Sequence, residues 1–318
     1  MKKKTLSVIT PVYNRADCVE RCLASVVTQE VPEGWTLEHV VVDDGSVDGS
    51  YGIVETFSRT NLIIRHDRLP ENRGTNAARN RAIHLATGKW IVFLDSDDTM
   101  LPGAVTTICT TIDSEPEFSH FLFATDDTSD NRESLGKEKV LCFEDFLLDK
   151  IDGDFVHVFL RSRPLSFPFD EELRIFEGMF FLKYYKEAGN IKFRREVLFH
   201  LDRKRDDHVS FSLRMTSDKA LKTKLSALSQ MTKLYSDDYR KSAEGRDILS
   251  SILRERYVLS VLSGDYATAD SVKVDLENLG QSAPMIFKTI RRFRGGRMVW
   301  PVIKLMLKIK HKLRRKSP

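Results

Sequence analysis

Residues Trp90–Asp98 read WIVFLDSDD, a short apolar run that ends in a cluster of carboxylates. A run of this length and composition is typical of a strand that is covered on both faces of a sheet. Three earlier runs share the pattern, and we expect strands at all four places: Leu6–Thr10, His39–Val42, Leu62–Arg65 and Trp90–Leu94. Pro11 directly follows the first run and is expected to end that strand.

Each predicted strand is followed by a segment with helical features. After Asp17, which is a suitable N-cap, Val19, Leu23 and Val26 fall on one face of a helix. Three further helices are expected, at Ser50–Thr60, Gly74–Ala86 and Pro102–Ile112. Strands and helices that alternate in this way predict an α/β fold, with a mostly parallel sheet flanked by helices.

The C-terminal part of the chain has a different pattern. Helical segments dominate from about residue 210 onward, near 216–235, 243–262 and 266–279, and the charge cluster Asp202–Asp207 precedes them. We therefore expect three parts: an α/β domain at residues 1–208, a helical appendage at 209–280 and a basic amphipathic tail at 281–318.

The bulk composition limits the class of protein. The 318 residues are 41% hydrophobic and 30% charged, which excludes general disorder. No apolar run reaches the length of about 18 residues that a transmembrane helix needs. The four cysteines are too few and scattered for a disulfide framework, and they indicate a reducing, cytoplasmic compartment. Cys18 and Cys22 are expected to be small buried residues, since no second pair completes a zinc site.

Three polar clusters follow predicted strands: Pro11–Arg15, Asp43–Ser46 and Asp95–Asp98. Open α/β sheets bind ligands beyond the carboxyl ends of their strands, where these clusters would lie. The third cluster holds three carboxylates, which repel one another unless they are solvated or bound to a cation. Such hard oxygen ligands suit Mg²⁺ or Mn²⁺. The alternative is an acidic N-terminus for the helix near Pro102.

The other segments allow two interpretations each. The acidic residues of Asp43–Ser46 can accept a hydrogen bond from a nucleotide base or a ribose hydroxyl, or they can simply form a turn. Tyr13 can pack against a nucleotide base, and Arg15 can form an ion pair with a phosphate. Alternatively, Tyr13 can belong to the core. Arg73 and Arg79 could also reach a phosphate. The chain has neither a P-loop sequence there nor a GxGxxG motif after its first strand.

Four segments together resemble the family 2 glycosyltransferases, which have the GT-A fold. The resemblance lies, in chain order, in Ser7–Arg15 (SVITPVYNR), Val42–Ser46 (VDDGS), Asn72–Asn80 (NRGTNAARN) and Phe93–Asp98 (FLDSDD). It implies an enzyme that moves a sugar from a nucleotide-sugar donor to an acceptor hydroxyl. A UDP-sugar is the default donor of this family.

The resemblance also implies which residues bind the donor. Pro11, Tyr13 and Asp44 fall where the family holds the base and the ribose, and Arg79 falls in the segment that lines the nucleotide side. Arg15 is expected to meet phosphate charge.

The acidic cluster would then hold the cation. Asp95 and Asp97 match the family's DxD motif, where Mn²⁺ or Mg²⁺ bridges the sugar-nucleotide diphosphate. Asp98 is adjacent and is expected to share that role.

The general base of the inverting members is usually an Asp in a Glu-Asp pair that opens a later helix. Here the register places Glu177 on the Glu and Gly178 on the Asp, which is a departure from the family pattern. Either Glu177 takes over as the base, or a neighbour among Asp170, Glu171 and Glu172 does. Otherwise the chain is an impaired enzyme that binds sugar nucleotides as a scaffold.

The tail suggests where the acceptor lies. Residues 281–318 hold twelve Lys and Arg and no acidic residue, and apolar positions from Trp300 onward form a stripe. Such a helix is typical of an anionic membrane interface, which would place the enzyme at the inner face of the cytoplasmic membrane. The acceptor would be a saccharide or a lipid-linked saccharide of surface polysaccharide or glycolipid assembly. A solvated tail or a helix packed on the domain is the alternative, and nucleic acid is not expected.

Overall fold

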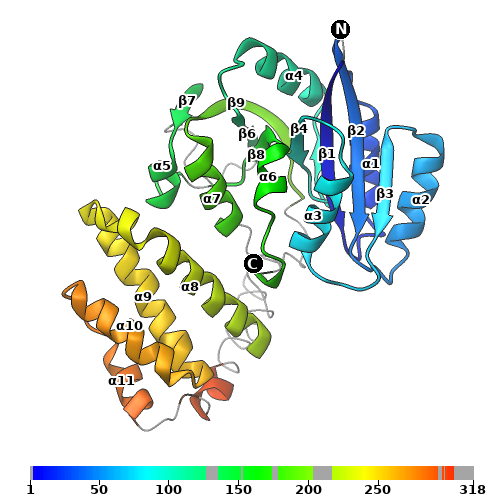
Figure 1. The fold of residues 1–318 in the computed structure, drawn as a ribbon. Helices are drawn as coiled ribbons and strands as arrows, with labels where there is room; N and C mark the ends of the chain where they lie inside the picture. The colour runs from blue at the N-terminus through cyan, green and yellow to red at the C-terminus, as the bar shows by residue number, and fades with distance from the viewer. Residues whose placement is uncertain are drawn as a thin grey trace, which may run out of the picture. The chain divides into compact units, whose positions relative to one another are not determined.

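The computed structural model describes residues 3–126, 135–151, 153–173, 178–202, 217–292, 296 and 298–303. The chain divides into two compact units, residues 1–204 and 205–318, which Figure 1 shows in ribbon form. The predicted boundary after residue 208 falls within residues 203–216, which lie outside the described residues. The further division at residue 280 stays a prediction.

All four predicted strands are present in unit 1, and their pairing is parallel. Their bounds are β1 Lys4–Val12, β2 Trp35–Asp43, β3 Ile64–Arg68 and β4 Trp90–Phe93. They lie in the order β3-β2-β1-β4, and Val8 of β1 is in register with His39 of β2 and Val92 of β4. This half of the sheet confirms the α/β class.

Pro11 does not end β1, contrary to the expectation from the sequence. Pro11 is in register with Val42, and the strand continues to Val12. The Ile9 carbonyl accepts from Leu94 N, just beyond the end of β4, so the main-chain groups of Ile9 face β4. Two residues later, the missing N–H of Pro11 faces the same side, where β4 has already ended and no donor is needed.

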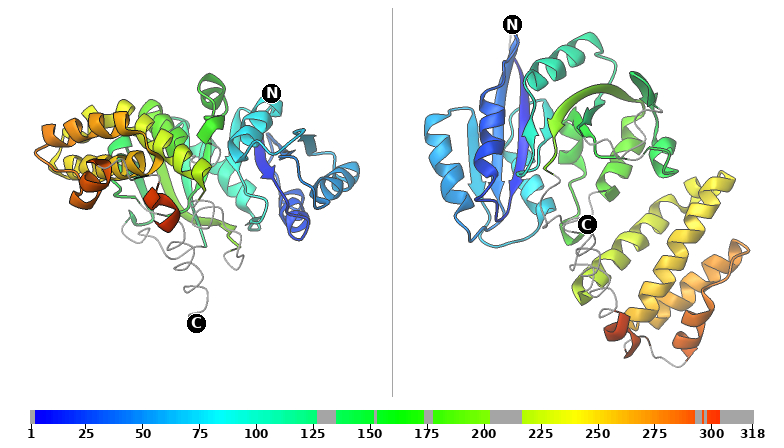
Figure 2. Two further views of the ribbon diagram at one scale, coloured as in Figure 1. Left: turned by 90° about the horizontal axis from the view of Figure 1, so that it is seen from below. Right: turned by 180° about the vertical axis from the view of Figure 1, so that it is seen from behind.

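The four predicted helices cover both faces of this sheet. Their bounds are α1 Val19–Val27, α2 Ser50–Thr60, α3 Thr75–Leu85 and α4 Ala104–Ser114. Side chains of α1, α2 and α4 share apolar clusters on one face, and α3 packs on the other, as Figure 2 shows. Asp17 is not the N-cap of α1; that position is Cys18, which makes no side-chain cap.

The second half of the sheet is mixed rather than parallel. Its strands are β5 Thr99–Met100, β6 His120–Thr125, β7 Glu138–Leu141, β8 Val156–Leu160 and β9 Ile191–His200. Strand β8 is antiparallel to β4 and β6, whereas β9 is parallel to β6 and antiparallel to β5 and β7. The helices of this half are α5 Phe143–Leu147, α6 Ser162–Ser166, the short 3-10 helix η2 Glu171–Leu173, and α7 Gly178–Ala188.

Unit 2 is helical, as the sequence predicts. Its helices are α8 Asp218–Arg240, α9 Ala243–Ser263, α10 Tyr266–Asn278 and α11 Met285–Arg292. Ser217, Ser242 and Asp265 cap α8, α9 and α10 by accepting a backbone N–H three residues later.

Trp300, the predicted start of the apolar stripe, belongs to the core of unit 2, and the stripe beyond Ile303 stays a prediction. Its ring packs in a cluster with Leu221 and Leu262, and its Nε1 donates to Asp218 Oδ1 at 2.7 Å. Up to residue 303 the structure therefore favours a helix packed on the unit, which was one of the alternatives for the tail. Residues 304–318 lie outside the described residues.

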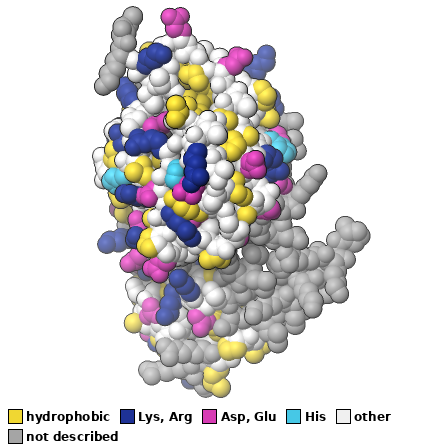
Figure 3. All heavy atoms as spheres, turned by 90° about the vertical axis from the view of Figure 1, so that its right-hand side faces the viewer, with side chains coloured by type: hydrophobic (Ala, Val, Ile, Leu, Met, Phe, Trp, Pro, Cys, Tyr) yellow, Lys and Arg dark blue, Asp and Glu magenta, His cyan; other side chains and the backbone are white. Residues whose placement is uncertain are grey.

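On the face in Figure 3, acidic and basic side chains of the described residues lie interspersed. No helix in the described part of the chain is both long enough and apolar enough to cross a membrane.

Candidate active site

The candidate site lies where β1, β2 and β4 end together. Because these strands are parallel, their carboxyl ends share one edge of the sheet. The backbone extends the pairing beyond the strands, since Asp44 N donates to Val12 O at 2.7 Å and Leu94 N donates to Ile9 O at 3.0 Å. The three polar clusters predicted from the sequence are thereby brought to the end of β1.

The loop after β1 is tied to the loop after β2. Asn14 takes up a left-handed conformation, with φ of 51°, and its backbone N–H donates to Ser46 Oγ at 2.9 Å. Pro11 is buried, whereas Tyr13 and Arg15 are partly exposed. Tyr13 and Arg15 are thus partly accessible at the edge of the candidate site.

Asp44 organises the loop that precedes α3. Its carboxylate accepts from Arg73 N at 2.8 Å, from Gly74 N at 2.8 Å and from Asn72 Nδ2 at 3.0 Å. The side chain is buried. Asp44 therefore has a structural role in addition to the predicted contact with base or ribose, because it joins the β2 and α3 ends of the site.

Each carboxylate of the acidic cluster has a partner from elsewhere in the fold. Arg79 Nη2 donates to Asp95 Oδ1 at 3.0 Å, and Arg15 Nε lies 3.5 Å from Asp97 Oδ2. Asp98 Oδ1 accepts from Asp202 N at 3.0 Å. The predicted donor-binding arginines and the predicted cation ligands thus meet in one place.

The acidic cluster does not form the N-terminus of the next helix. Strand β5 intervenes, and α4 begins only at Ala104, after an N-cap Gly103 that makes no side-chain cap. This finding removes the simpler explanation for the three carboxylates. Within the described residues, no group of three or more His, Cys, Asp or Glu side chains is arranged to hold a metal ion by itself.

Cys18 and Cys22 are free and buried, which confirms the expectation from the sequence. Both thiols point to the backbone of the acidic loop, with Cys22 Sγ 3.6 Å from Asp95 O and Cys18 Sγ 3.7 Å from Ser96 O. Burial, together with the nearby carboxylates, holds the pKa of Cys22 far above its usual value. Cys22 therefore supports the loop as a neutral small side chain.

Two site neighbours were not identified from the sequence. Arg21 of α1 donates from Nη2 to Asp97 O at 2.9 Å and to Asp202 Oδ2 at 2.7 Å. Asp202 follows β9, a strand that the sequence analysis did not predict. A prediction of β9 as a neighbour of β5 would have placed Asp202 beside the acidic cluster.

The comparisons with known proteins agree with this geometry. The model of glycosyl transferase family 2 matches residues 7–172, which is about half of the chain and includes all four motifs. The chain belongs to this family. It is therefore a glycosyltransferase, and the resemblance seen in the sequence is confirmed.

One curated relative of this family 2 glycosyltransferase comes from Campylobacter jejuni. It is GalNAc(5)-diNAcBac-PP-undecaprenol beta-1,3-glucosyltransferase, which is 30% identical over 191 residues. The match covers 58% of this chain and 60% of the relative. The chain therefore matches less than two thirds of the length of this relative.

Two solved structures show the same fold at low sequence identity. Residues 1–349 of S. aureus TarS, in complex with UDP-GlcNAc, match with a TM-score of 0.61 and 18% identity, over 97% of this chain and 92% of that one. The mannosyltransferase PcManGT from Pyrobaculum calidifontis, in complex with GDP-Man and Mn²⁺, matches with a TM-score of 0.54 and 16% identity, over 95% and 87%. These matches confirm the GT-A architecture of the family 2 glycosyltransferase.

The region that is expected to hold the general base of the glycosyltransferase lies only partly within the described residues. Glu177 lies within residues 174–177, outside the described residues, and Gly178 is the first residue of α7. Glu171 accepts from Arg73 Nη2 at 2.5 Å and from Asn80 Nδ2 at 3.2 Å, so both of its oxygens are engaged. Asp170 Oδ1 accepts from Glu172 N at 2.9 Å.

Proposed function

We propose that this glycosyltransferase transfers a sugar, with inversion, from a UDP-sugar to a hydroxyl of a saccharide or lipid-linked acceptor. The observation that carries the proposal is the convergence of Asp44, Asp95, Asp97 and Asp98 at the carboxyl ends of β2 and β4, on either side of β1. Two arginines, Arg15 and Arg79, lie at the same place. Carboxylates and arginines together suit a nucleoside diphosphate and its counterion.

The residues at the end of β4 fit a divalent cation. The Asp95 side chain is 52% exposed and therefore accessible, and its charge is balanced by Arg79 on one oxygen. Asp95, Asp97 and Asp98 would offer hard oxygen ligands. Because these three side chains do not form a complete metal-binding group by themselves in the described structure, the cation would bind together with the diphosphate. A Mn²⁺ or Mg²⁺ ion held by these residues would supply positive charge to the nucleoside diphosphate leaving group.

The residues of the chain have separate tasks in this proposal. Pro11, Tyr13 and Asp44 hold the base and ribose, and Arg15 and Arg79 meet the phosphates. Glu177 accepts the proton of the acceptor hydroxyl as it attacks the anomeric carbon from the opposite face. A positioned base of this kind contributes typically about 10²–10⁴-fold to the rate. The engagement of both Glu171 oxygens makes that residue the weaker alternative.

The proposed location is the inner face of the cytoplasmic membrane. The four cysteines are free, in accord with a reducing compartment. Met285 and Ile286 of α11 are 83% and 66% exposed, and basic residues follow them in the sequence. Exposed apolar side chains beside basic ones are suited to an anionic bilayer, where lipid-linked acceptors of surface polysaccharide or glycolipid assembly reside.

The test is a screen of nucleotide sugars by thermal shift with Mn²⁺ present, because a ligand that binds the folded state raises the midpoint of unfolding. A UDP-sugar should stabilise the chain, and Asp97→Ala should remove the part of the shift that depends on Mn²⁺. If Asp97→Ala behaves as the wild type, Asp97 does not hold the cation.

Gly178 supports a second candidate, a sugar-nucleotide-binding protein with impaired catalysis. The two candidates differ in turnover. An active enzyme should hydrolyse the selected donor slowly in the presence of Mn²⁺, and Glu177→Gln should abolish sugar transfer without weakening donor binding. Donor binding without any turnover would favour the second candidate.

A further inference from the structure

Asn80 of α3 holds the backbone of Phe169 at two points. Its Nδ2 donates to Phe169 O at 2.9 Å, and its Oδ1 accepts from Phe169 N at 2.9 Å. Asn80 is only 8% exposed. An asparagine amide has a donor and an acceptor side by side, so it can satisfy both backbone groups of one residue in a loop.

Phe169 in turn contacts both sides of the site. Its ring stacks on Phe180, in the first turn of α7, with 3.8 Å between the ring centroids. On the other side, the guanidinium carbon of Arg79 lies 5.8 Å from the Phe169 ring centroid, and Arg79 pairs with Asp95. A continuous set of contacts therefore runs from the acidic cluster through Phe169 to the start of α7.

The rest of the loop is attached to the same helix. Asn76 Nδ2 donates to Asp170 O at 2.8 Å, and Asn80 Nδ2 also donates to Glu171 Oε1 at 3.2 Å. Asn76 and Asn80 are four residues apart and so lie on one face of α3. Three successive loop residues are thus held by two asparagines one helical turn apart.

We propose that Asn80 is a positioning residue that fixes the start of α7 relative to the donor side of the site. This inference rests on the proposed function, in which Glu177, the general base for the acceptor hydroxyl, precedes Gly178 in the sequence. Among the described residues, the Asn80 side chain hydrogen-bonds to Phe169 and Glu171 and to no member of the acidic cluster. Its loss should therefore affect the acceptor side and leave donor binding intact.

The activity test compares Asn80→Ala with Asn61→Ala. Asn61 is a matched control, because its Nδ2 also donates to a main-chain carbonyl, Phe57 O, at 2.8 Å, but at the end of α2. With UDP and Mn²⁺ as the probe, calorimetry should give the wild-type Kd for both variants. With UDP-GlcNAc or the donor selected by the screen, and octyl glycosides as model acceptors, Asn80→Ala should lower kcat/KM for the acceptor by about 10–100-fold, the effect of losing buried hydrogen bonds.

A purely structural role of Asn80 predicts a different result. In that case the variant would lose donor affinity, hydrolysis and transfer together, in proportion to the folded fraction, and the proposal would be overturned. An unchanged kcat/KM for the acceptor would also overturn it. Asn80→Asp keeps the volume and the acceptor for Phe169 N but places an oxygen against Phe169 O, so it should reproduce the effect of Asn80→Ala.

Amide hydrogen exchange tests the coupling without any sugar. In Asn80→Ala the amides of residues 182–185, which follow the first turn of α7 and donate to its carbonyls, should exchange faster than in the wild type, whereas in Asn61→Ala they should exchange at the wild-type rate. Equal protection of α7 in all three proteins would refute the coupling. A wild type that binds no sugar nucleotide would refute the proposed function but would leave this measurement valid.

Discussion

The guanidinium of Arg79 and the carboxylate of Asp95 form an ion pair, with Nη2 and Oδ1 3.0 Å apart. The Arg79 side chain is 7% exposed and that of Asp95 is 52% exposed. Arg79 comes from α3 and lies over the ring of Phe93, 5.2 Å from its centroid. It is therefore a preorganised cation at the place where the diphosphate is proposed to bind.

Replacement of Arg79 by Ala should weaken the binding of UDP in the presence of Mn²⁺. The loss of a charge-assisted hydrogen bond corresponds to about 1.5–3 kcal/mol, or about a 10–100-fold increase in Kd. Calorimetry measures this directly. Arg81→Ala is the control, because Arg81 lies on the same helix in an exposed ion pair with Asp67. Equal affinities of the two variants would show that Arg79 does not contact the diphosphate.

Gly45→Ala should displace the loop that Asp44 organises. Gly45 has φ of +73°, and a Cβ there would lie 2.7 Å from the carbonyl carbon of Glu71. Strain in the left-handed region alone costs about 1–2 kcal/mol, and the contact with Glu71 adds to it. Both the free energy of unfolding and the affinity for UDP should fall.

Gly34→Ala separates these two causes. Gly34 has φ of +85°, but a Cβ there would meet nothing within 4 Å. This control should show the backbone strain and keep the affinity for UDP. If Gly45→Ala loses no more stability than Gly34→Ala, the close approach of the two loops is not important.

The half of the fold made of β1 to β4 was predictable from the sequence. Strands β1, β2 and β4 are buried over most of their length, so their residues form apolar runs that are easy to recognise. Strand β3 is more exposed, and the predicted run Leu62–Arg65 overlaps it only at Ile64 and Arg65. Strand β9 carries Lys192, Arg194, Arg195 and Glu196 among its apolar residues. Two of these, Lys192 and Arg194, form ion pairs with Glu115 at the end of α4, and that pairing is not visible in a local pattern.

The site residues differ in the same way. Asp44, Asp95 and Arg79 lie in local motifs, so the sequence could propose them as candidates, whereas the role proposed for Asn80 depends on Phe169, which is 89 residues away in the sequence. The same holds for Arg21, whose bond to Asp202 spans 181 residues. Such pairs are brought together only by the mixed half of the sheet and by the loop before α7.

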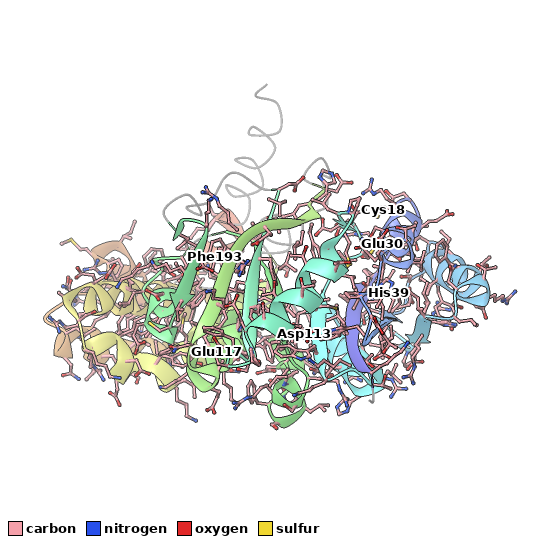
Figure 4. All side chains as sticks on the ribbon, turned by 90° about the horizontal axis from the view of Figure 1, so that it is seen from above. Cys18, Glu30, His39, Asp113, Glu117 and Phe193 are labelled. Carbon is pink, nitrogen blue, oxygen red and sulfur yellow. The ribbon has the colours of Figure 1, made fainter. Side chains whose placement is uncertain are left out.

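Buried histidines should make the protein sensitive to acid. His39, inside β2 (Figure 4), is fully buried, and burial lowers its pKa to about 3. Burial also lowers the pKa of His120, with a further contribution from His157. In the unfolded chain a histidine has a pKa of about 6.5, so the unfolded state binds more protons below that pH. The free energy of unfolding should therefore fall as the pH drops below about 6.5, by up to about 1.4 kcal/mol per pH unit for each histidine.

His39→Gln tests this contribution. His39 Nε2 lies 2.8 Å from Thr10 Oγ1, and a glutamine amide can keep a polar partner for Thr10 but does not titrate. Urea unfolding at neutral pH and at about pH 5 should show a smaller acid loss in the variant than in the wild type. The same loss in both proteins would mean that His39 does not set the acid sensitivity.

Truncation after Ile303 should separate membrane binding from the stability of unit 2. Trp300 is buried and its Nε1 donates to Asp218 at 2.7 Å, so a larger deletion would remove part of the core. Residues 304–318 contain seven of the twelve basic residues of the tail, and each is worth about 1 kcal/mol at best near an anionic leaflet. The truncated protein should keep its midpoint of unfolding and sediment less with phosphatidylserine vesicles. Trp300→Phe should lower the midpoint of unfolding, because it loses a buried hydrogen bond worth about 1 kcal/mol. It should leave sedimentation with the vesicles unchanged, because it removes no charge. Undiminished sedimentation of the truncated protein would place the membrane contact elsewhere or exclude it.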